Sequence, residues 1–208
     1  MGNKLEQLAL WYLRLNGYLT VPNFVLHPDT PGSERTDADI LAVRFPYSRE
    51  VAGTPMERDD TLVRQDERID FIIAEVKSGV CRLNGPWIKP ETQNMQYVLR
   101  WLGMIEEESE VQEVARKLYE NRVYEGEDWG LRLACFGSRR SERLHHNVVQ
   151  ITHEEAVKFM SDRFRRHADI KTSHRQWDDF IKNFYRMAVQ NCLPTPEILK
   201  WLSPPADR

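Results

Sequence analysis

Residues 69–77 read IDFIIAEVK, and this stretch decides the fold. The nearly continuous apolar run over 69–76 predicts a strand covered on both faces, as in sheets flanked by helices. A second run of this kind, DILAVRF, occupies residues 39–45. Because side chains two apart on a strand face the same way, Glu75 and Lys77 project together while Val76 points to the opposite face. The two runs therefore predict a pair of central strands with charged side chains at one end.

If these strands are neighbours, Asp39 at the start of one meets Glu75 at the end of the other. Two carboxylates, with water and phosphate oxygens, form a hard-oxygen site suited to Mg²⁺ or Mn²⁺. Such an ion polarises a phosphoryl oxygen and helps to produce hydroxide, while Lys77 stabilises charge or orients the attacking water. We expect Asp39, Glu75 and Val76 to form the metal site. Asp37 is a rival for the role of Asp39 because it lies on the same strand face.

The pattern of apolar residues and caps extends this pair of strands into the order αβββαβ, followed by a helical tail. Asn3 caps a first helix, and Asn16-Gly17 ends it in the left-handed manner. Pro22 interrupts the next strand, which indicates an edge position or a bulge. This order is typical of an α/β sandwich. The expected elements are a helix at 3–16, a strand at 18–26, loops at 27–36 and 46–68, helices at 90–105 and 106–124, strands at 129–136 and 147–151, and helices at 152–167, at 173–190 and after Pro196.

The 208 residues suit one sizeable domain with a helical appendage. We place the core at residues 1–151 and a helical C-terminal extension, packed on that core, at 152–208. No apolar run approaches the roughly 20 residues that cross a bilayer, and no signal peptide is visible. The three cysteines are widely spaced, which fits a reducing compartment. We therefore expect a cytoplasmic protein without a membrane partner.

The charged residues resemble a known family. Asp39 with Glu75-Val76-Lys77 resembles the motif of the PD-(D/E)XK nuclease superfamily, whose core order is αβββαβ. Gln93 and Tyr97 fit the Q-x-x-x-Y pattern of its exonuclease-like members, and they lie one helical turn apart on the same face. The resemblance covers about residues 3–137, with Ala38 where the superfamily's name expects Pro. It implies a restriction-endonuclease-like fold with a mixed central sheet flanked by helices.

The resemblance also implies a function, the metal-dependent hydrolysis of phosphodiester bonds, most plausibly in DNA. Glu6 on the first helix stands where many members carry an acidic residue near the metal. Gln93 and Tyr97 are expected to contact the substrate. The implied catalytic residues are Asp39, Glu75, Lys77 and Glu6, with Mg²⁺ or Mn²⁺ as cofactor. Two alternatives stay open: a nuclease-fold subunit that binds nucleic acid or a protein partner without cleaving, and an α/β interaction protein with fortuitous carboxylates. The superfamily spans restriction, repair and mobile-element defence, so a homodimer or a subunit of a larger complex is a further expectation.

Charge is unevenly distributed along the chain. The net charge is −3, but residues 1–131 hold 15 Lys+Arg against 23 Asp+Glu, which gives −8, and residues 132–186 hold 12 against 7, which gives +5. An acidic half that binds cations beside a basic half that binds phosphates fits a metal-dependent enzyme acting on a polyanion. We expect a loop after the fourth strand to bind phosphate through Arg139, Arg140 and Arg143. A second group, Arg163, Arg165 and Arg166, falls near a helix end, where a solvated basic surface is nearly as good an interpretation.

Aromatic and histidine residues leave two further alternatives. Trp87, Trp101, Trp129 and Trp177 could stack on bases, although aromatic residues at such spacings more often belong to a core. His145, His146 and His153 lie close together in the sequence, but the spacing of a four-ligand metal site is missing. We therefore interpret these histidines as solvated residues around a strand and the helix after it.

Overall fold

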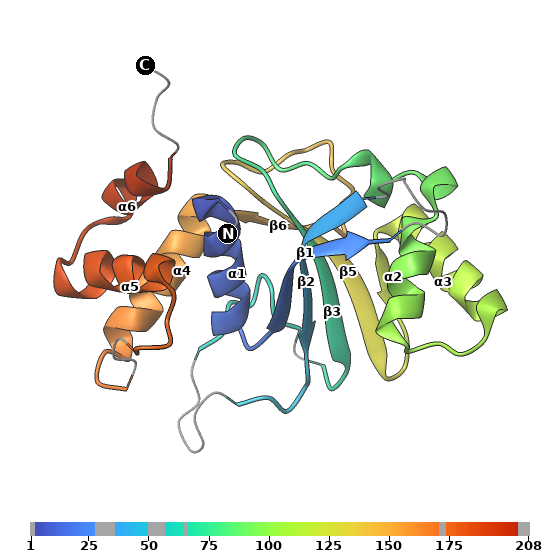
Figure 1. Ribbon diagram of the computed structural model, residues 1–208, viewed down its shortest axis with the longest axis horizontal. Coiled ribbons are helices and arrows are strands. Elements are labelled where there is room, and N and C mark those ends of the chain that lie inside the picture. Colours follow the sequence, from blue (N-terminus) through green and yellow to red (C-terminus); the bar gives the residue numbers. More distant parts are fainter. Residues whose placement is uncertain (1–2, 28–35, 50–56, 65, 171–173, 204–208) are drawn as a thin grey trace.

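The computed structural model describes residues 3–27, 36–49, 57–64, 66–170 and 174–203. These residues form an α/β structure in which helices cover both faces of an open, mixed sheet of six strands (Figure 1). The strands are β1 Leu19–Leu26, β2 Thr36–Arg44, β3 Ile69–Val76, β4 Val123–Glu125, β5 Trp129–Gly137 and β6 Val149–Thr152. The helices are α1 Lys4–Leu15, α2 Asn94–Leu102, α3 Glu108–Asn121, α4 His153–Arg166, α5 Asp179–Tyr185 and α6 Thr195–Leu202, with short turns η1 Gly85–Trp87, η2 Pro90–Thr92 and the π-helical η3 Arg186–Gln190.

The strand order is β1-β2-β3-β5-β4, and β6 also pairs with β5. The expected neighbours β2 and β3 pair antiparallel, in a register that sets Ile40 opposite Ala74. β3 and β5 are parallel. β4 pairs with the first half of β5 and β6 with its last four residues, so both lie along one edge of that strand. The carboxyl ends of β3, β5 and β6 therefore meet at one end of the sheet.

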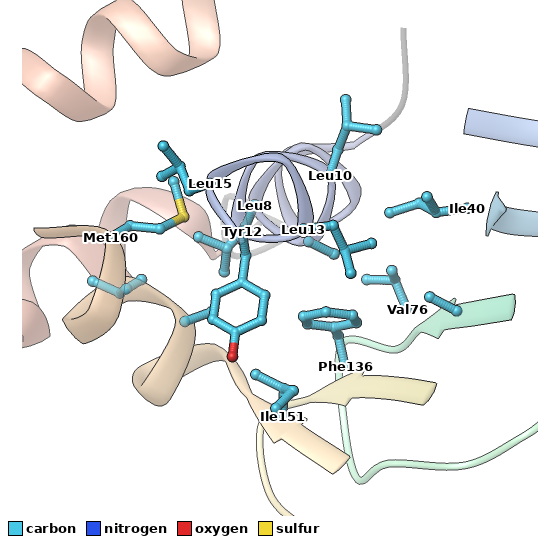
Figure 2. Close-up of a cluster of buried hydrophobic side chains, with 14 of the residues drawn as sticks. Leu8, Leu10, Tyr12, Leu13, Leu15, Ile40, Val76, Phe136, Ile151 and Met160 are labelled. Carbon is cyan, nitrogen blue, oxygen red and sulfur yellow. The ribbon is translucent and has the colours of Figure 1, made fainter. Parts of the chain in front are cut away.

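The sheet separates two hydrophobic cores. The first core lies between the sheet and helices α1 and α4 and continues to α5 and α6, which pack against these two helices, and the second core lies between the opposite face and α2, α3 and η1. Figure 2 shows Tyr12 and Leu13 projecting from α1 toward Val76 and Phe136 of the sheet. The Tyr12 and Phe136 rings pack edge to face, with centroids 5.6 Å apart. Because each central strand has an apolar layer on both sides, its continuous apolar sequence is explained.

The C-terminal helices complete the first core. Met160 and Phe164 of α4, Phe184 of α5 and Leu202 of α6 are buried in the same cluster as α1. α4 begins with a capping box, in which the Thr152 side chain accepts from the Glu155 N–H. The extension beyond residue 151 therefore shares its apolar packing with the sheet and α1.

Several expected boundaries are corrected. β2 begins at Thr36 rather than Asp39 and ends at Arg44, so Phe45 lies outside the strand and is exposed. The helix expected over 90–105 divides into η2 and α2, because Gln93 adopts a left-handed φ of 56° between them. The helix expected from residue 173 starts at 179, where the Asp178 side chain caps it by accepting from Ile181 N–H. Part of the expected loop at 27–36 lies outside the described residues. The edge position expected from Pro22 is confirmed, since β1 ends the sheet.

Candidate active site

The structure brings Asp39, Glu75 and Lys77 together at the carboxyl end of β3. Lys77 Nζ lies 2.5 Å from Glu75 Oε2 and 3.9 Å from Asp39 Oδ2. The backbone N–H of Val76 donates to Asp39 Oδ2 over 2.6 Å. One ammonium group therefore lies between two carboxylates that come from neighbouring strands.

The β2–β3 register accounts for this meeting. The last pair of the ladder is Ile40↔Ala74, and one further step in the same register sets Asp39 opposite Glu75. Residues opposite each other on paired strands face the same side of the sheet. Lys77 follows Glu75 by two positions and projects to that side as well. The prediction that these two strands are direct neighbours is confirmed.

Side-chain exposure increases from Glu75 toward solvent. The Glu75 side chain is 1% exposed, that of Lys77 is 13% exposed, and that of Asp39 is 21% exposed. Glu75 is thus the floor of the site, and the other two groups form its rim.

Both oxygens of the Glu75 carboxylate have partners. The indole N–H of Trp87 donates to Oε1 over 2.6 Å, and Lys77 Nζ lies at Oε2. Burial raises the pKa of the Glu75 carboxyl above its ordinary value, the Lys77 ammonium and the Trp87 N–H lower it in part, and the Asp39 carboxylate raises it further. Burial therefore outweighs the favourable contacts that Lys77 and Trp87 make with the ionised Glu75 carboxylate.

The donor groups fit a hydrated Mg²⁺ or Mn²⁺ ion. Asp39 and Glu75 supply carboxylate oxygens, and Val76 has only its backbone to offer, since its side chain packs in the first core. Within the part of the chain that the structure describes, no group of three or more His, Cys, Asp or Glu residues is placed to hold a metal. A small divalent cation that keeps several waters and takes one or two carboxylates matches such a sparse donor set.

The Glu6 carboxylate has a structural role in the first helix. Its Oε2 accepts from the Asn3 N–H over 3.0 Å, and its Oε1 accepts from Asn3 Nδ2 over 2.6 Å. This is the carboxylate half of a capping box at the start of α1. The catalytic role implied for Glu6 by the resemblance stays a prediction.

Gln93 and Tyr97 lie at the start of α2. Gln93 is exposed, and its carbonyl accepts from the Tyr97 N–H over 3.4 Å, which makes them neighbours on one helical turn. The Tyr97 ring is half-buried and lies 5.4 Å from the Arg100 guanidinium. Their contact with a substrate also stays a prediction.

The loop after β5 that carries Arg139, Arg140 and Arg143, called the arginine loop below, lies directly beside the segment that follows Lys77. The Ser138 N–H donates to the Gly79 carbonyl over 2.7 Å, and the Cys81 N–H donates to the Arg139 carbonyl over 2.9 Å. The three arginines of this loop are exposed, and Arg140 pairs with Glu155 at 2.7 Å. Both segments thus lead away from the same end of the sheet, and the loop arginines are Arg139, Arg140 and Arg143.

The helix-borne arginines are used differently. Arg163 is buried and donates to the Glu57 carbonyl, and Arg166 pairs with the Glu57 carboxylate. Arg165 donates to the carbonyls of Ala188 and Leu193 over 2.8 and 2.7 Å. These contacts hold α4 to its neighbours, so this group is a set of structural contacts rather than a free basic surface.

The sequence did not single out two positions on the segments that lead to the site. Asn23 of β1 has a φ of 49°, unusual for a non-glycine residue inside a strand. A Cβ on Gly137 would lie 2.8 Å from both the Gly79 carbonyl oxygen and the Cys81 nitrogen, so only glycine lets the segment after Lys77 approach β5 this closely. A non-glycine residue with positive φ leaves no signal in a sequence, whereas the glycine at the end of a predicted strand could have been noticed.

The remaining candidates belong to the scaffold. Trp87 and Trp129 are buried, Trp177 packs against the first core, and Trp101 is exposed against Phe24. The interpretation of His153 as solvated is wrong, since it is buried at the first position of α4. The His145 and His146 rings stack with centroids 4.3 Å apart, and the cysteines are free thiols at positions 81, 135 and 192.

No helix among the described residues combines the length and the apolar character needed to span a bilayer. Comparison with known proteins gives no match to any family model, curated protein or solved structure.

Proposed function

We propose that this protein is a divalent-metal-dependent nuclease that hydrolyses phosphodiester bonds, most plausibly in DNA. The observation that carries the proposal is the meeting of Asp39, Glu75 and Lys77 at one end of the central sheet, with the ammonium 2.5 Å from one carboxylate and 3.9 Å from the other. We also assign the fold, on the same residues and the order of elements, to the PD-(D/E)XK type.

The residues divide the chemistry between them. Asp39 and Glu75 would hold the cation, which when bound supplies Lewis acidity and a more acidic water. Lys77 Nζ donates hydrogen bonds to the phosphoryl oxygen or orients the water that attacks phosphorus, where negative charge grows in the transition state. Glu75 holds the Lys77 side chain in place through their ion pair.

The arginine loop would hold the nucleic-acid backbone. Its backbone hydrogen bonds to Gly79 and Cys81 fix it beside the segment that follows Lys77. Guanidinium groups bind phosphate oxygens through charge-assisted hydrogen bonds. The phosphates next to the reacting one would then bind to Arg139, Arg140 and Arg143.

One observation favours a second candidate, a nuclease-fold subunit that binds without cleaving. Trp87 and Lys77 between them satisfy both oxygens of Glu75, so the fold does not require a metal to compensate this buried carboxylate. Such a protein would bind nucleic acid or a protein partner through the same end of the sheet.

Cleavage assays decide between the two. Purified protein is incubated with circular DNA, linear DNA and RNA in Mg²⁺, Mn²⁺ or chelator, beside Glu75→Gln protein prepared identically. The nuclease proposal predicts metal-dependent cleavage by the wild type alone, with cutting of circular DNA if it acts internally. Equal cleavage by both proteins would mean a contaminant, and binding without cleavage under every condition would favour the second candidate.

A further inference from the structure

We propose that Trp87 is the positioning residue of Glu75, which it restricts to presenting a single oxygen, Oε2, to the cation. This inference rests on the proposed metal-dependent function. Its basis is the division of the carboxylate between two partners: the indole N–H lies 2.6 Å from Oε1, and Lys77 Nζ lies 2.5 Å from Oε2.

The indole is held rigidly enough to act in this way. Trp87 is fully buried in the second core and ends the short turn η1, where its backbone N–H donates to the Asn84 carbonyl over 3.1 Å. The preceding carbonyl, that of Pro86, accepts from the Thr92 hydroxyl over 3.0 Å and from Asn94 Nδ2 over 3.3 Å. The turn is thereby tied to the start of α2.

The hydrogen bond has a preferred direction for both partners. An indole nitrogen can only donate a hydrogen bond, and a buried donor without an acceptor is unfavourable. The Glu75 oxygen that faces Trp87 must therefore be an acceptor. Because a carboxylate is planar, fixing Oε1 also fixes the direction of Oε2. Glu75 would therefore bind a cation through one oxygen, with no freedom to rotate and chelate it through two.

Hydrogen-bonding partners of metal-binding carboxylates commonly contribute about 10–100-fold to metal affinity. Trp87→Phe keeps an aromatic ring and removes the donor. Trp129→Phe is the matched control, because Trp129 is a buried tryptophan of the same core. The two oxygens of Glu75 have Trp87 and Lys77 as their partners, so the control keeps both of these contacts. Both variants lose a similar volume, so loss of packing alone affects them alike.

The first arm of the experiment measures Mn²⁺ affinity by calorimetry on wild type, Trp87→Phe and Trp129→Phe, with thermal unfolding measured in parallel. We expect roughly tenfold weaker binding in Trp87→Phe and a change of less than about twofold in Trp129→Phe. Equal affinities in the two variants would overturn the proposal. Absence of Mn²⁺ binding in the wild type would instead contradict the proposed metal-dependent function.

The second arm does not need the Trp87 variant to fold well. The indole N–H resonance of Trp87, identified by its absence in Trp87→Phe or by its coupling to the backbone, is followed by NMR in wild type and Glu75→Gln. A hydrogen bond to a carboxylate predicts a downfield, slowly exchanging indole proton that moves upfield in Glu75→Gln, while the Trp129 resonance stays in place. An indole proton indifferent to Glu75→Gln would overturn the proposal whatever the metal does.

Discussion

Asn23 and Asp39 lie opposite each other at the one step that the β1–β2 ladder omits. The ladder passes from Pro22↔Ile40 to Phe24↔Ala38, and Asn23 between them has a φ of 49°. Ala38 packs in the second core and Ile40 in the first, although residues two apart on a regular strand face the same side. The alternation of β2 therefore restarts at Asp39, and this restart lets the carboxylate share a side with Glu75.

Substitutions at Asn23 should act on Asp39 through the backbone. Glycine at position 23 adopts a positive φ without strain. Asn23→Val places a β-branched residue at this positive φ, and the resulting backbone strain destabilises the folded state by about 1–3 kcal/mol. We expect Asn23→Val to lower both the free energy of unfolding and Mn²⁺ affinity, and Asn23→Gly to leave Mn²⁺ affinity within about twofold of wild type. Chemical denaturation and calorimetry measure the two quantities. A valine variant that binds Mn²⁺ normally would mean that this kink does not position Asp39.

Asp39 and Asp37 form a natural pair for assigning the metal-binding carboxylate. Asp39→Asn keeps an acceptor for the Val76 N–H, so the folded state should lose less than about 1 kcal/mol, while Mn²⁺ affinity should fall more than about tenfold. Asp37→Asn, at an exposed position of the same strand, should change neither. If Asp37→Asn weakened binding and Asp39→Asn did not, the rival assignment would be correct.

Lys77 separates metal binding from catalysis. In Lys77→Met the ammonium no longer competes at Glu75 Oε2, so Mn²⁺ should bind at least as tightly as in wild type. Cleavage should fall by about 100-fold or more, as when an electrostatic stabiliser of the transition state is removed. Calorimetry and a DNA-cleavage time course measure these effects, with the exposed Lys89→Met as control. Loss of Mn²⁺ binding in Lys77→Met would show that the lysine holds the site together instead.

The arginine loop predicts a salt-dependent contact with DNA. Replacing Arg139, Arg140 and Arg143 by Ala should lower DNA affinity and flatten its dependence on salt, because fewer counterions are released on binding. Mn²⁺ affinity should stay unchanged. Fluorescence anisotropy at several salt concentrations measures the slope, and a triple variant of Arg116, Lys117 and Lys200 provides a control of equal charge on α3 and α6. Equal slopes in the two triple variants would place the DNA path elsewhere.

Gly137 and Gly79 give a matched pair for the close approach beside the site. Gly137→Ala introduces a Cβ 2.8 Å from the Gly79 carbonyl oxygen, so the backbone must shift. We expect the free energy of unfolding to fall by about 1–3 kcal/mol. A Cβ on Gly79 meets no atom within 4 Å, so Gly79→Ala should change stability by less than about 0.5 kcal/mol. Urea denaturation measures both. Similar losses in the two variants would mean that the packing at Gly137 is not limiting.

The central pair of strands could be predicted from the sequence because a strand buried on both faces has a nearly continuous run of apolar residues. β3 has the predicted bounds, and the meeting of Asp39 with Glu75 follows from strand alternation once the two runs are assumed to pair. The N-cap at Asn3 was also predictable, because asparagine is a favoured residue immediately before a helical apolar stripe.

The partner of Glu75 was not readable in the same way. Trp87 lies twelve positions later in an irregular segment, with no period that relates the two. Its tryptophan character predicted a core residue or a stacking platform, whereas the contact depends on the three-dimensional path of η1. Asn23 was hidden for another reason: asparagine tolerates positive φ, but nothing in the sequence says where it adopts it.

The ion pair between the buried Glu75 carboxylate and the partly exposed Lys77 ammonium has a consequence for mutational surveys that score only protein abundance. Removing Lys77 leaves the buried Glu75 carboxylate with only the Trp87 N–H as partner, which is destabilising, whereas replacing both charged residues by apolar residues of similar volume is often neutral or stabilising. A library screened for folding alone would thus discard the single variants and retain some inert doubles. Glu75 and Lys77 would then be scored as residues that reduce stability. Only a screen for activity would show that they are needed for catalysis.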